Sequence, residues 1–219
     1  MKYEINLKDL EKCCYCERPA TGRDHLPPKN IFPNPRPTNL ITVPTCKKCN
    51  QSASKDDEYF GYIIIAGSVQ HPLAEQLFRT KKMDKIRRRP ALGYSLLKDF
   101  VDIDVYKGNI YLGTQPGMRS RGKRINPVME RVTKGFIFHH LKYRLPVNYN
   151  VMVSKVNPPL SKTQTDSIAS LELHSIGEEI LSYRFYQDDN DPFISYWFFM
   201  FYNSLLIMTT TDPEIGSGI

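Results

Sequence analysis

Apolar residues recur at helical spacing in three stretches along the middle of the chain. These stretches are 59–66, 72–88 and 126–143, where apolar positions return every three or four residues. The Ser-Lys-Asp-Asp run at 54–57 matches a capping box, so we expect the first helix to begin there. A proline stops the second helix, and an Asn-Pro pair caps the third at its start. The pattern therefore predicts a mainly helical middle.

Alternation of apolar and polar residues predicts strands elsewhere. Residues 100–114 alternate on both sides of Lys107-Gly108-Asn109, which indicates a β-hairpin. A short extended run at 40–43 predicts one strand near the N-terminus. Beyond Pro146 the strand pattern dominates, and it predicts strands at 149–156, 181–187, 194–202 and 205–211.

The uncharged stretch 192–211 is twenty residues long, which is the length of a membrane span. Its first half is rich in aromatic residues, and the polar pair Asn203-Ser204 interrupts it near the middle. Aromatic and β-branched residues around a polar pair favour two buried strands joined by a turn. We therefore expect no membrane association.

Composition and charge place the chain among soluble globular proteins with a polyanionic partner. Of 219 residues, 41% are hydrophobic and 24% are charged, and the net charge is +7. Residues 144–219 hold four basic and nine acidic residues, so the positive charge belongs to residues 1–143. Such asymmetry favours nucleic acid as the partner of the first two thirds of the chain.

Two clusters of basic residues are the candidates for contact with a nucleic-acid backbone. We expect them to hold phosphates without reading bases, since no recognition-helix or RNA-recognition signature is present. The alternative is an ordinary solvated helix face. The candidates are Arg79, Lys81, Lys82, Lys85, Arg87, Arg88 and Arg89, followed by Arg119, Arg121, Lys123 and Arg124.

All five cysteines lie within the first 49 residues. Cys13 and Cys16 form one C-x2-C pair, and Cys46 and Cys49 form another, the spacing of a tetrahedral structural Zn²⁺ site. Cys14 is the spare thiol in this interpretation, and the alternative is a set of buried free cysteines. An odd, clustered count without an apolar leader favours a cytoplasmic metal-binding protein over a disulfide framework.

The segment between the two cysteine pairs carries the run Arg23-Asp24-His25-Leu26-Pro27-Pro28, then Asn39, then Asn50 directly after Cys49. With these residues in this order, residues 13–60 resemble the zinc-containing HNH endonuclease family. The third family position is often histidine, and here it is Asn50, a variant that the family also uses. The resemblance implies a ββα-metal element at the N-terminus and hydrolysis of phosphodiester bonds.

The resemblance also implies a role for each residue. His25 would be the general base that takes a proton from water, which suits a group with a pKa near neutrality. Asp24 and Asn50 would hold one Mg²⁺ or Mn²⁺ ion through hard oxygen ligands. Asn39 would fix the loop or orient His25, and Lys55 would lie beside the phosphate.

One geometric condition applies to this site. Adjacent residues of a regular strand point to opposite faces, so Asp24 and His25 share a site only if the strand bends or if the site lies at its edge.

Together these patterns predict an α+β protein: an N-terminal ββα-metal element with a four-cysteine zinc site, central helices and a C-terminal antiparallel strand region. The expected organisation is an HNH module over 1–66, a basic and mainly helical region over 67–146, and an acidic strand region over 147–219. The last region has no assigned role, and a protein partner or a homodimer contact is one candidate.

The function expected from the sequence is metal-dependent endonuclease activity on DNA. The alternatives are a non-catalytic zinc-containing nucleic-acid-binding or adaptor module, and an RNA-directed nuclease toxin. HNH domains often occur in phage enzymes and in anti-phage defence, which is the context that analogy suggests.

Overall fold

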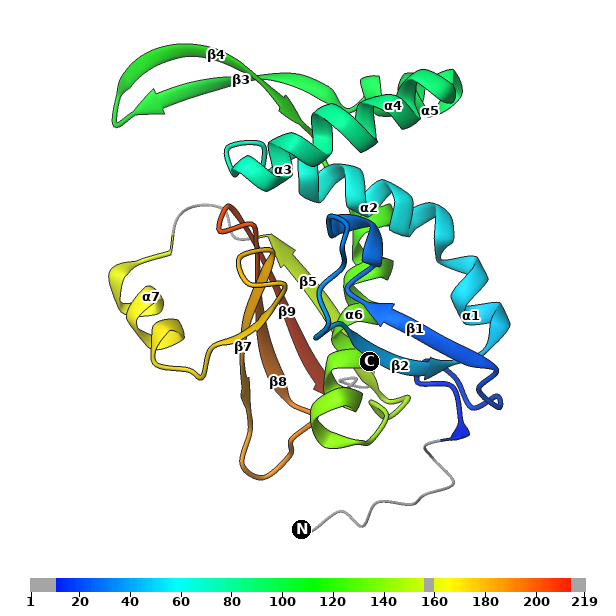
Figure 1. The fold of residues 1–219 in the computed structure, drawn as a ribbon. Coiled ribbons are helices and arrows are strands. Elements are labelled where there is room, and N and C mark those ends of the chain that lie inside the picture. Colours follow the sequence, from blue (N-terminus) through cyan, green and yellow to red (C-terminus); the bar gives the residue numbers. More distant parts are fainter. Residues whose placement is uncertain (1–10, 156–159, 214–219) are drawn as a thin grey trace, which may run out of the picture.

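The fold was analysed in a computed structural model that describes residues 11–155 and 160–213. It combines helices with three antiparallel sheets, so the predicted α+β class is confirmed at that level (Figure 1).

The N-terminal part is a two-stranded hairpin followed by two helices. The antiparallel pairing runs from Gly22 with Thr45 to Leu26 with Ile41, without a bulge. A hairpin of two strands is marginally stable alone, which explains why its inner face packs on a long helix later in the chain. The elements are β1 (Gly22–Leu26), the 3-10 turn η2 (Lys29–Ile31), β2 (Ile41–Thr45), α1 (Lys47–Ser52) and α2 (Ser54–Ala66).

The capping box predicted at 54–57 is not formed. Ala53 precedes α2 in a helical conformation, and no side chain caps the helix. The backbone N–H groups of Asp56 and Asp57 already donate to the carbonyl of Ala53. Because α1 leads almost directly into α2, these N–H groups need no side-chain partner.

The middle of the chain is helical up to residue 97 and then forms a hairpin. The helix predicted over 72–88 is present as two α-helical pieces around a π-helical turn, and the proline after it also begins a further helix. The predicted hairpin is confirmed, with Gly108 at a φ of 62° in its turn. These elements are α3 (Pro72–Leu77), η3 (Phe78–Lys82), α4 (Met83–Arg88), α5 (Pro90–Leu97), β3 (Phe100–Lys107) and β4 (Ile110–Met118).

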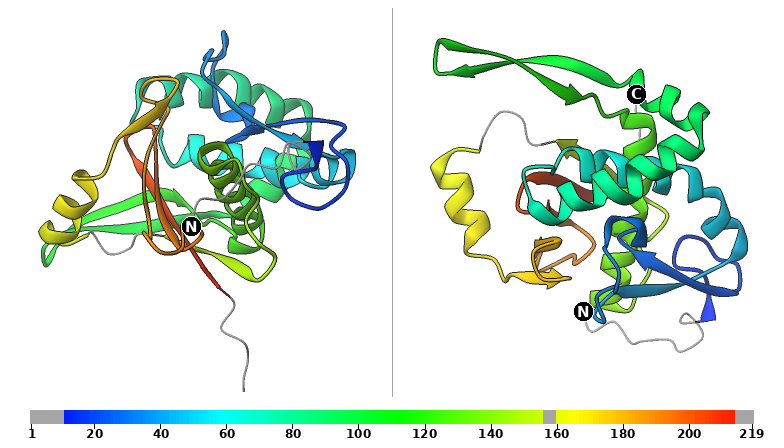
Figure 2. Two further views of the ribbon diagram at one scale, coloured as in Figure 1. Left: turned by 90° about the horizontal axis from the view of Figure 1, so that it is seen from below. Right: turned by 45° about the horizontal axis from the view of Figure 1, so that its top comes forward.

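The β3–β4 hairpin extends away from the other elements as an arm (Figure 1 and the right view of Figure 2). Among its described side chains, large apolar residues are exposed on both faces: Phe100, Ile103, Tyr106, Ile110, Tyr111 and Leu112.

The long helix α6 (Gly122–Leu141) is the centre of the structure. It begins four residues before the predicted Asn-Pro cap, so Pro127 lies inside it. Ion pairs from Arg121 to Asp99 and from Arg124 to Asp56 hold this early turn against neighbouring elements. One side of α6 packs on the N-terminal hairpin and another on the C-terminal sheet, with α2 beside it.

The C-terminal part is an antiparallel sheet of five strands in the order β5-β9-β8-β7-β6. All four predicted strands are confirmed within two residues at each described end, and residue 156 lies outside the described residues. The predicted turn at Asn203-Ser204 joins two of them. Helix α7 and the short edge strand β6 were not predicted. The elements are β5 (Tyr149–Lys155), α7 (Lys162–Ala169), β6 (His174–Ile176), β7 (Leu181–Gln187), β8 (Ser195–Phe201) and β9 (Leu205–Pro213).

One hydrophobic core runs through all three predicted regions. On α6, the ring of Phe136 makes edge contacts with Tyr183 and Phe199 of the sheet, at centroid distances of 4.7 and 5.2 Å. The same buried cluster includes Leu26 of the hairpin and Phe60 of α2. Among the described residues, no helix has the length and apolar character needed to cross a membrane.

Candidate metal centre and hairpin site

Four cysteines meet at the base of the N-terminal hairpin. The sulfur atoms of Cys13, Cys16, Cys46 and Cys49 all lie within 4.8 Å of one another. Cys46 directly precedes α1, and a hydrogen bond with the backbone of Cys49 lowers its pKa to about 6, which favours the thiolate that a metal requires. The four thiols are therefore close enough to bind a metal ion such as zinc, as predicted.

The fifth cysteine does not join this group. Cys14 is buried, and its thiol donates to the backbone carbonyl of Lys134 at 3.7 Å. Burial raises the pKa of this thiol, so it stays protonated. The assignment of Cys14 as the spare thiol agrees with this position.

Asp24 points inward from β1 and is held by two partners. Its Oδ2 accepts a hydrogen bond from the Tyr15 hydroxyl at 2.9 Å and lies 3.1 Å from Nε of Arg131 on α6. The same guanidinium donates to Asp57 of α2. No hydrogen bond to the other carboxylate oxygen, Oδ1, is found among the described residues. One oxygen of Asp24 is thus engaged, and the other remains for a further ligand.

Sequence reasoning did not identify this inward cluster. The residue that could have revealed the cluster is Arg131. It is a charged residue on the apolar face of the 126–143 helix, beside Val128 and Val132. A charge on such a face needs a buried partner, because an unpaired buried charge is costly. Tyr15 and Asp57 carried no comparable signal.

His25 lies on the opposite, outward face of the hairpin. It pairs across the ladder with Thr42 and is partly buried. Burial lowers its pKa below the ordinary value of 6.5, and the positive charges of Lys29 and Arg36 add to this effect. The imidazole is therefore neutral at pH 7 and able to accept a proton.

The regular ladder removes one of the two ways in which Asp24 and His25 were expected to share a site. The strand does not bend between them, so their side chains leave on opposite faces. The edge of the strand is the remaining place where an ion and a water molecule could approach both residues.

Asn39 is engaged with the C-terminal sheet, not with His25. Its amide nitrogen donates to the carbonyl of Ser175 at 3.0 Å, and its amide oxygen accepts from the N–H of Gly177 at 3.2 Å. It therefore fixes the loop before β2, which is one of its two expected roles. The other expected role, orienting His25, is not seen.

Asn50 and Lys55 are exposed on two consecutive helices. Asn50 lies on α1 directly after Cys49 of the cysteine cluster, and Lys55 lies in the first turn of α2. Among the described residues, the four cysteines are the one group of three or more Cys, His, Asp or Glu side chains that is arranged to share an ion. The expected catalytic residues come from β1, the loop before β2, α1 and α2.

Most of the basic candidates take part in ion pairs. Glu58 pairs with both Lys85 and Arg89, so acids from outside the 79–89 stretch neutralise part of it. Lys82 is buried, and its ammonium group donates to the carbonyl of Asn30 at 3.3 Å. The remaining pairs are Arg79 with Glu75, Arg87 with Asp84, Arg121 with Asp99 and Arg124 with Asp56.

Four basic side chains remain exposed without an ion pair among the described residues: Lys81, Arg88, Arg119 and Lys123. They are the part of the expected cationic surface that is most available to a phosphate backbone.

Comparisons with known proteins do not add to this picture. No family model, no curated protein and no solved structure matches the chain.

Proposed function

We propose that this protein is an endonuclease of the HNH type that hydrolyses phosphodiester bonds of DNA, with His25 as the general base. The observation that carries the proposal is the position of His25. A hairpin anchored by four cysteines presents it outward, partly exposed, with a pKa that keeps the imidazole neutral at pH 7.

The surroundings of His25 suit a phosphodiester. Arg23 leaves β1 on the same face, two residues away, and Lys29 and Arg36 are near enough to lower the pKa of His25. Cations beside a base can hold the phosphate while the imidazole takes a proton from the attacking water. Lys55 is exposed, as a phosphate-contacting residue must be.

The catalytic ion is a further part of the proposal. Asp24 would supply Oδ1, because Tyr15 and Arg131 hold the carboxylate through Oδ2 and thereby fix its orientation. Asn50 would supply its exposed amide oxygen. When bound, Mg²⁺ or Mn²⁺ would neutralise charge on the phosphate and on the leaving oxygen.

One observation favours a second candidate, a zinc-containing module that binds nucleic acid or acts as an adaptor without cleaving. The carboxylate expected to hold the catalytic ion already faces the guanidinium of Arg131. The guanidinium of Arg131 can neutralise the carboxylate of Asp24 in place of a metal ion, and a protein without the catalytic ion would bind nucleic acid without cleaving it.

A panel of substrates and metals separates these functions. Supercoiled plasmid, single-stranded DNA and RNA would each be incubated with the zinc-loaded protein in EDTA, Mg²⁺ or Mn²⁺. Cleavage of DNA that requires Mg²⁺ or Mn²⁺ is the expected result. Cleavage of RNA alone would indicate the toxin, and binding of DNA without cleavage under any condition would support the adaptor.

A further inference from the structure

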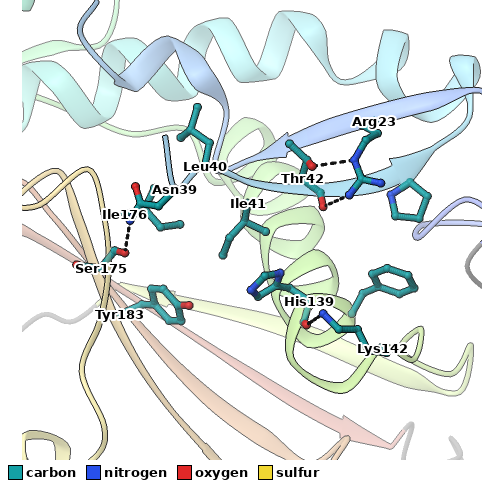
Figure 3. Close-up of a pocket in the computed structure, with 12 residues that line it drawn as sticks. Arg23, Asn39, Leu40, Ile41, Thr42, His139, Lys142, Ser175, Ile176 and Tyr183 are labelled. Atoms are coloured by element: carbon teal, nitrogen blue, oxygen red, sulfur yellow. Dashed lines mark hydrogen bonds between the residues drawn. The ribbon is translucent and has the colours of Figure 1, made fainter. Parts of the chain in front are cut away.

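A cavity of about 690 Å³ lies where the N-terminal hairpin, the end of α6 and the edge of the C-terminal sheet meet (Figure 3). This volume is within the range of small-molecule binding sites. Arg23 and Thr42 lie on one side of it, and Asn39 and Ser175 on the other, with His139 and Tyr183 between them.

The walls of the cavity are fixed before any ligand binds. Asn39 donates one hydrogen bond to the carbonyl of Ser175 and accepts one from the N–H of Gly177, and this pair joins the hairpin loop to the sheet edge. The hydroxyl of Tyr183 lies 3.1 Å from Nε2 of His140, which joins the sheet to α6. A preformed site spares a ligand the cost of ordering its own pocket.

The charged side chains that line the cavity are cationic, and no carboxylate is among the described lining residues. The guanidinium of Arg23 uses Nε and one terminal nitrogen on Thr42, which leaves the other terminal nitrogen to donate. The ammonium of Lys142 donates to the carbonyl of His139 at 2.5 Å and retains two further protons. Charge and donors therefore favour a bound anion.

Apolar and aromatic side chains complete the lining. Ile41, Phe138, Ile176 and Tyr183 form the apolar floor of the cavity. Each is only 2–7% exposed, and the ring of Tyr183 is stacked on His174, so a flat, weakly polar group would meet only a small part of each side chain. His139 has a pKa below 6.5 because it is partly buried, so its neutral imidazole can accept or donate one hydrogen bond. A ligand that fits both halves combines an anionic group with a planar heterocycle.

We propose that this cavity binds one nucleoside monophosphate unit, with its phosphate at Arg23 and Lys142 and its base against Phe138 and Tyr183. The unit has two possible sources: a free nucleotide, or the unstacked end of a single strand. The proposal goes beyond the nuclease function, because it requires binding alone: it shares Arg23 with the proposed nuclease site but does not use His25.

The test is equilibrium binding by isothermal titration calorimetry, with the zinc-loaded full chain and no added divalent metal. The probes are deoxyadenosine 5′-monophosphate, deoxyadenosine, inorganic phosphate and a 5′-phosphorylated tetranucleotide. The variants are Lys142→Gln and Tyr183→Phe, with Lys98→Gln as the matched control, an exposed lysine outside the cavity. Melting temperature and zinc content verify that each variant is folded.

Saturable binding of the monophosphate, weaker for both deoxyadenosine and inorganic phosphate, is the expected result. Lys142→Gln should weaken it about tenfold to a hundredfold, as loss of one hydrogen bond to a charged group does, while Lys98→Gln leaves it unchanged. Tyr183→Phe, which keeps the ring, should retain most of the affinity. Tighter binding of the tetranucleotide would identify a strand end as the source, and equal or weaker binding a free nucleotide.

Two results would overturn the proposal. One is the absence of saturable binding of both the monophosphate and the tetranucleotide. The other is binding that inorganic phosphate matches or that Lys142→Gln does not change. Neither result bears on cleavage, which is tested through His25, so failure of this inference is distinguishable from failure of the nuclease proposal.

Discussion

Nε of Arg131 lies 3.1 Å from Oδ2 of Asp24, and each of these side chains is only 10% exposed. The same guanidinium reaches Asp57, so one arginine on α6 joins β1 to α2. Both acids belong to the N-terminal segment that we propose to be the nuclease module. The long helix that follows this segment therefore completes its structure.

We predict that Arg131→Met destabilises the protein by about 3–5 kcal/mol, because it leaves two carboxylates in a buried site without their cation. The free energy of unfolding in urea measures the effect. Arg79→Met is the matched control, since Arg79 pairs with Glu75 at the surface and is 75% exposed. The control should change stability by less than about 0.5 kcal/mol. Equal effects for the two variants would contradict the role assigned to Arg131.

Gly135 tests the packing of α6 on the hairpin. A Cβ atom at this position would lie 1.9 Å from Cδ1 of Leu26, which is fully buried. Gly135→Ala should therefore cost about 1–3 kcal/mol of stability, although alanine is the better helix former. At Gly122, the start of the same helix, the nearest atom would lie 3.7 Å away. Gly122→Ala should be neutral or stabilising, and a neutral Gly135→Ala would show that the hairpin does not pack here.

The cysteine cluster predicts opposite results for two adjacent thiols. Cys13→Ser should lose zinc and lower the melting temperature, because Cys13 is one of the four clustered ligands. Cys14→Ser should keep about one zinc ion per chain, as expected for a closed four-sulfur site. Elemental analysis of the purified variants measures this directly. Zinc retained by Cys13→Ser and lost by Cys14→Ser would reverse the assignment.

His140 predicts how stability depends on pH. Burial, with the nearby charges of His139, His174 and Lys142, lowers the pKa of His140 to about 4. The unfolded chain, with a histidine pKa near 6.5, then binds the proton more readily than the folded chain. The contribution of His140 to the free energy of unfolding is therefore fully present above pH 6.5 and is lost as the pH falls toward 4.

The measurement is urea unfolding at pH 7 and pH 5, for the wild type and for His140→Gln. The wild type should lose about 1 kcal/mol more than the variant between these two values, after allowance for the partial exposure of the ring. An identical loss in both proteins would show that folding does not lower the pKa of His140.

Local patterns in the sequence were sufficient for most elements. The four C-terminal strands, the β3–β4 hairpin and the two C-x2-C pairs depend on periodicity or fixed spacing, and all three predictions hold. The missed edge strand β6 has only three residues, too few for a periodicity to be visible. The capping box failed because Ala53 continues a preceding helix that the sequence did not reveal.

The arrangement of the site depended on contacts that no local pattern encodes. The two-residue period of a strand indicated that the side chains of Asp24 and His25 would point to opposite faces. It did not indicate that Arg131, more than a hundred residues later, would pair with Asp24. Asn39 was expected to fix the loop or to orient His25, and the partner through which it holds the loop is the backbone of a strand that was not predicted. The sequence therefore did not predict which distant residues the polar side chains contact.

If His25 is the base in DNA cleavage, two histidine variants should differ sharply in activity. Nicking of supercoiled plasmid in Mg²⁺ or Mn²⁺ would be measured for the wild type, His25→Ala and His71→Gln, all with verified zinc content and DNA binding. His71 pairs with Glu179 and is not part of the proposed site, so it serves as the control. Activity should fall about 10²–10⁴-fold in His25→Ala alone. Cleavage by His25→Ala at the wild-type rate, or no cleavage by a zinc-loaded wild type that binds DNA, would contradict this role of His25.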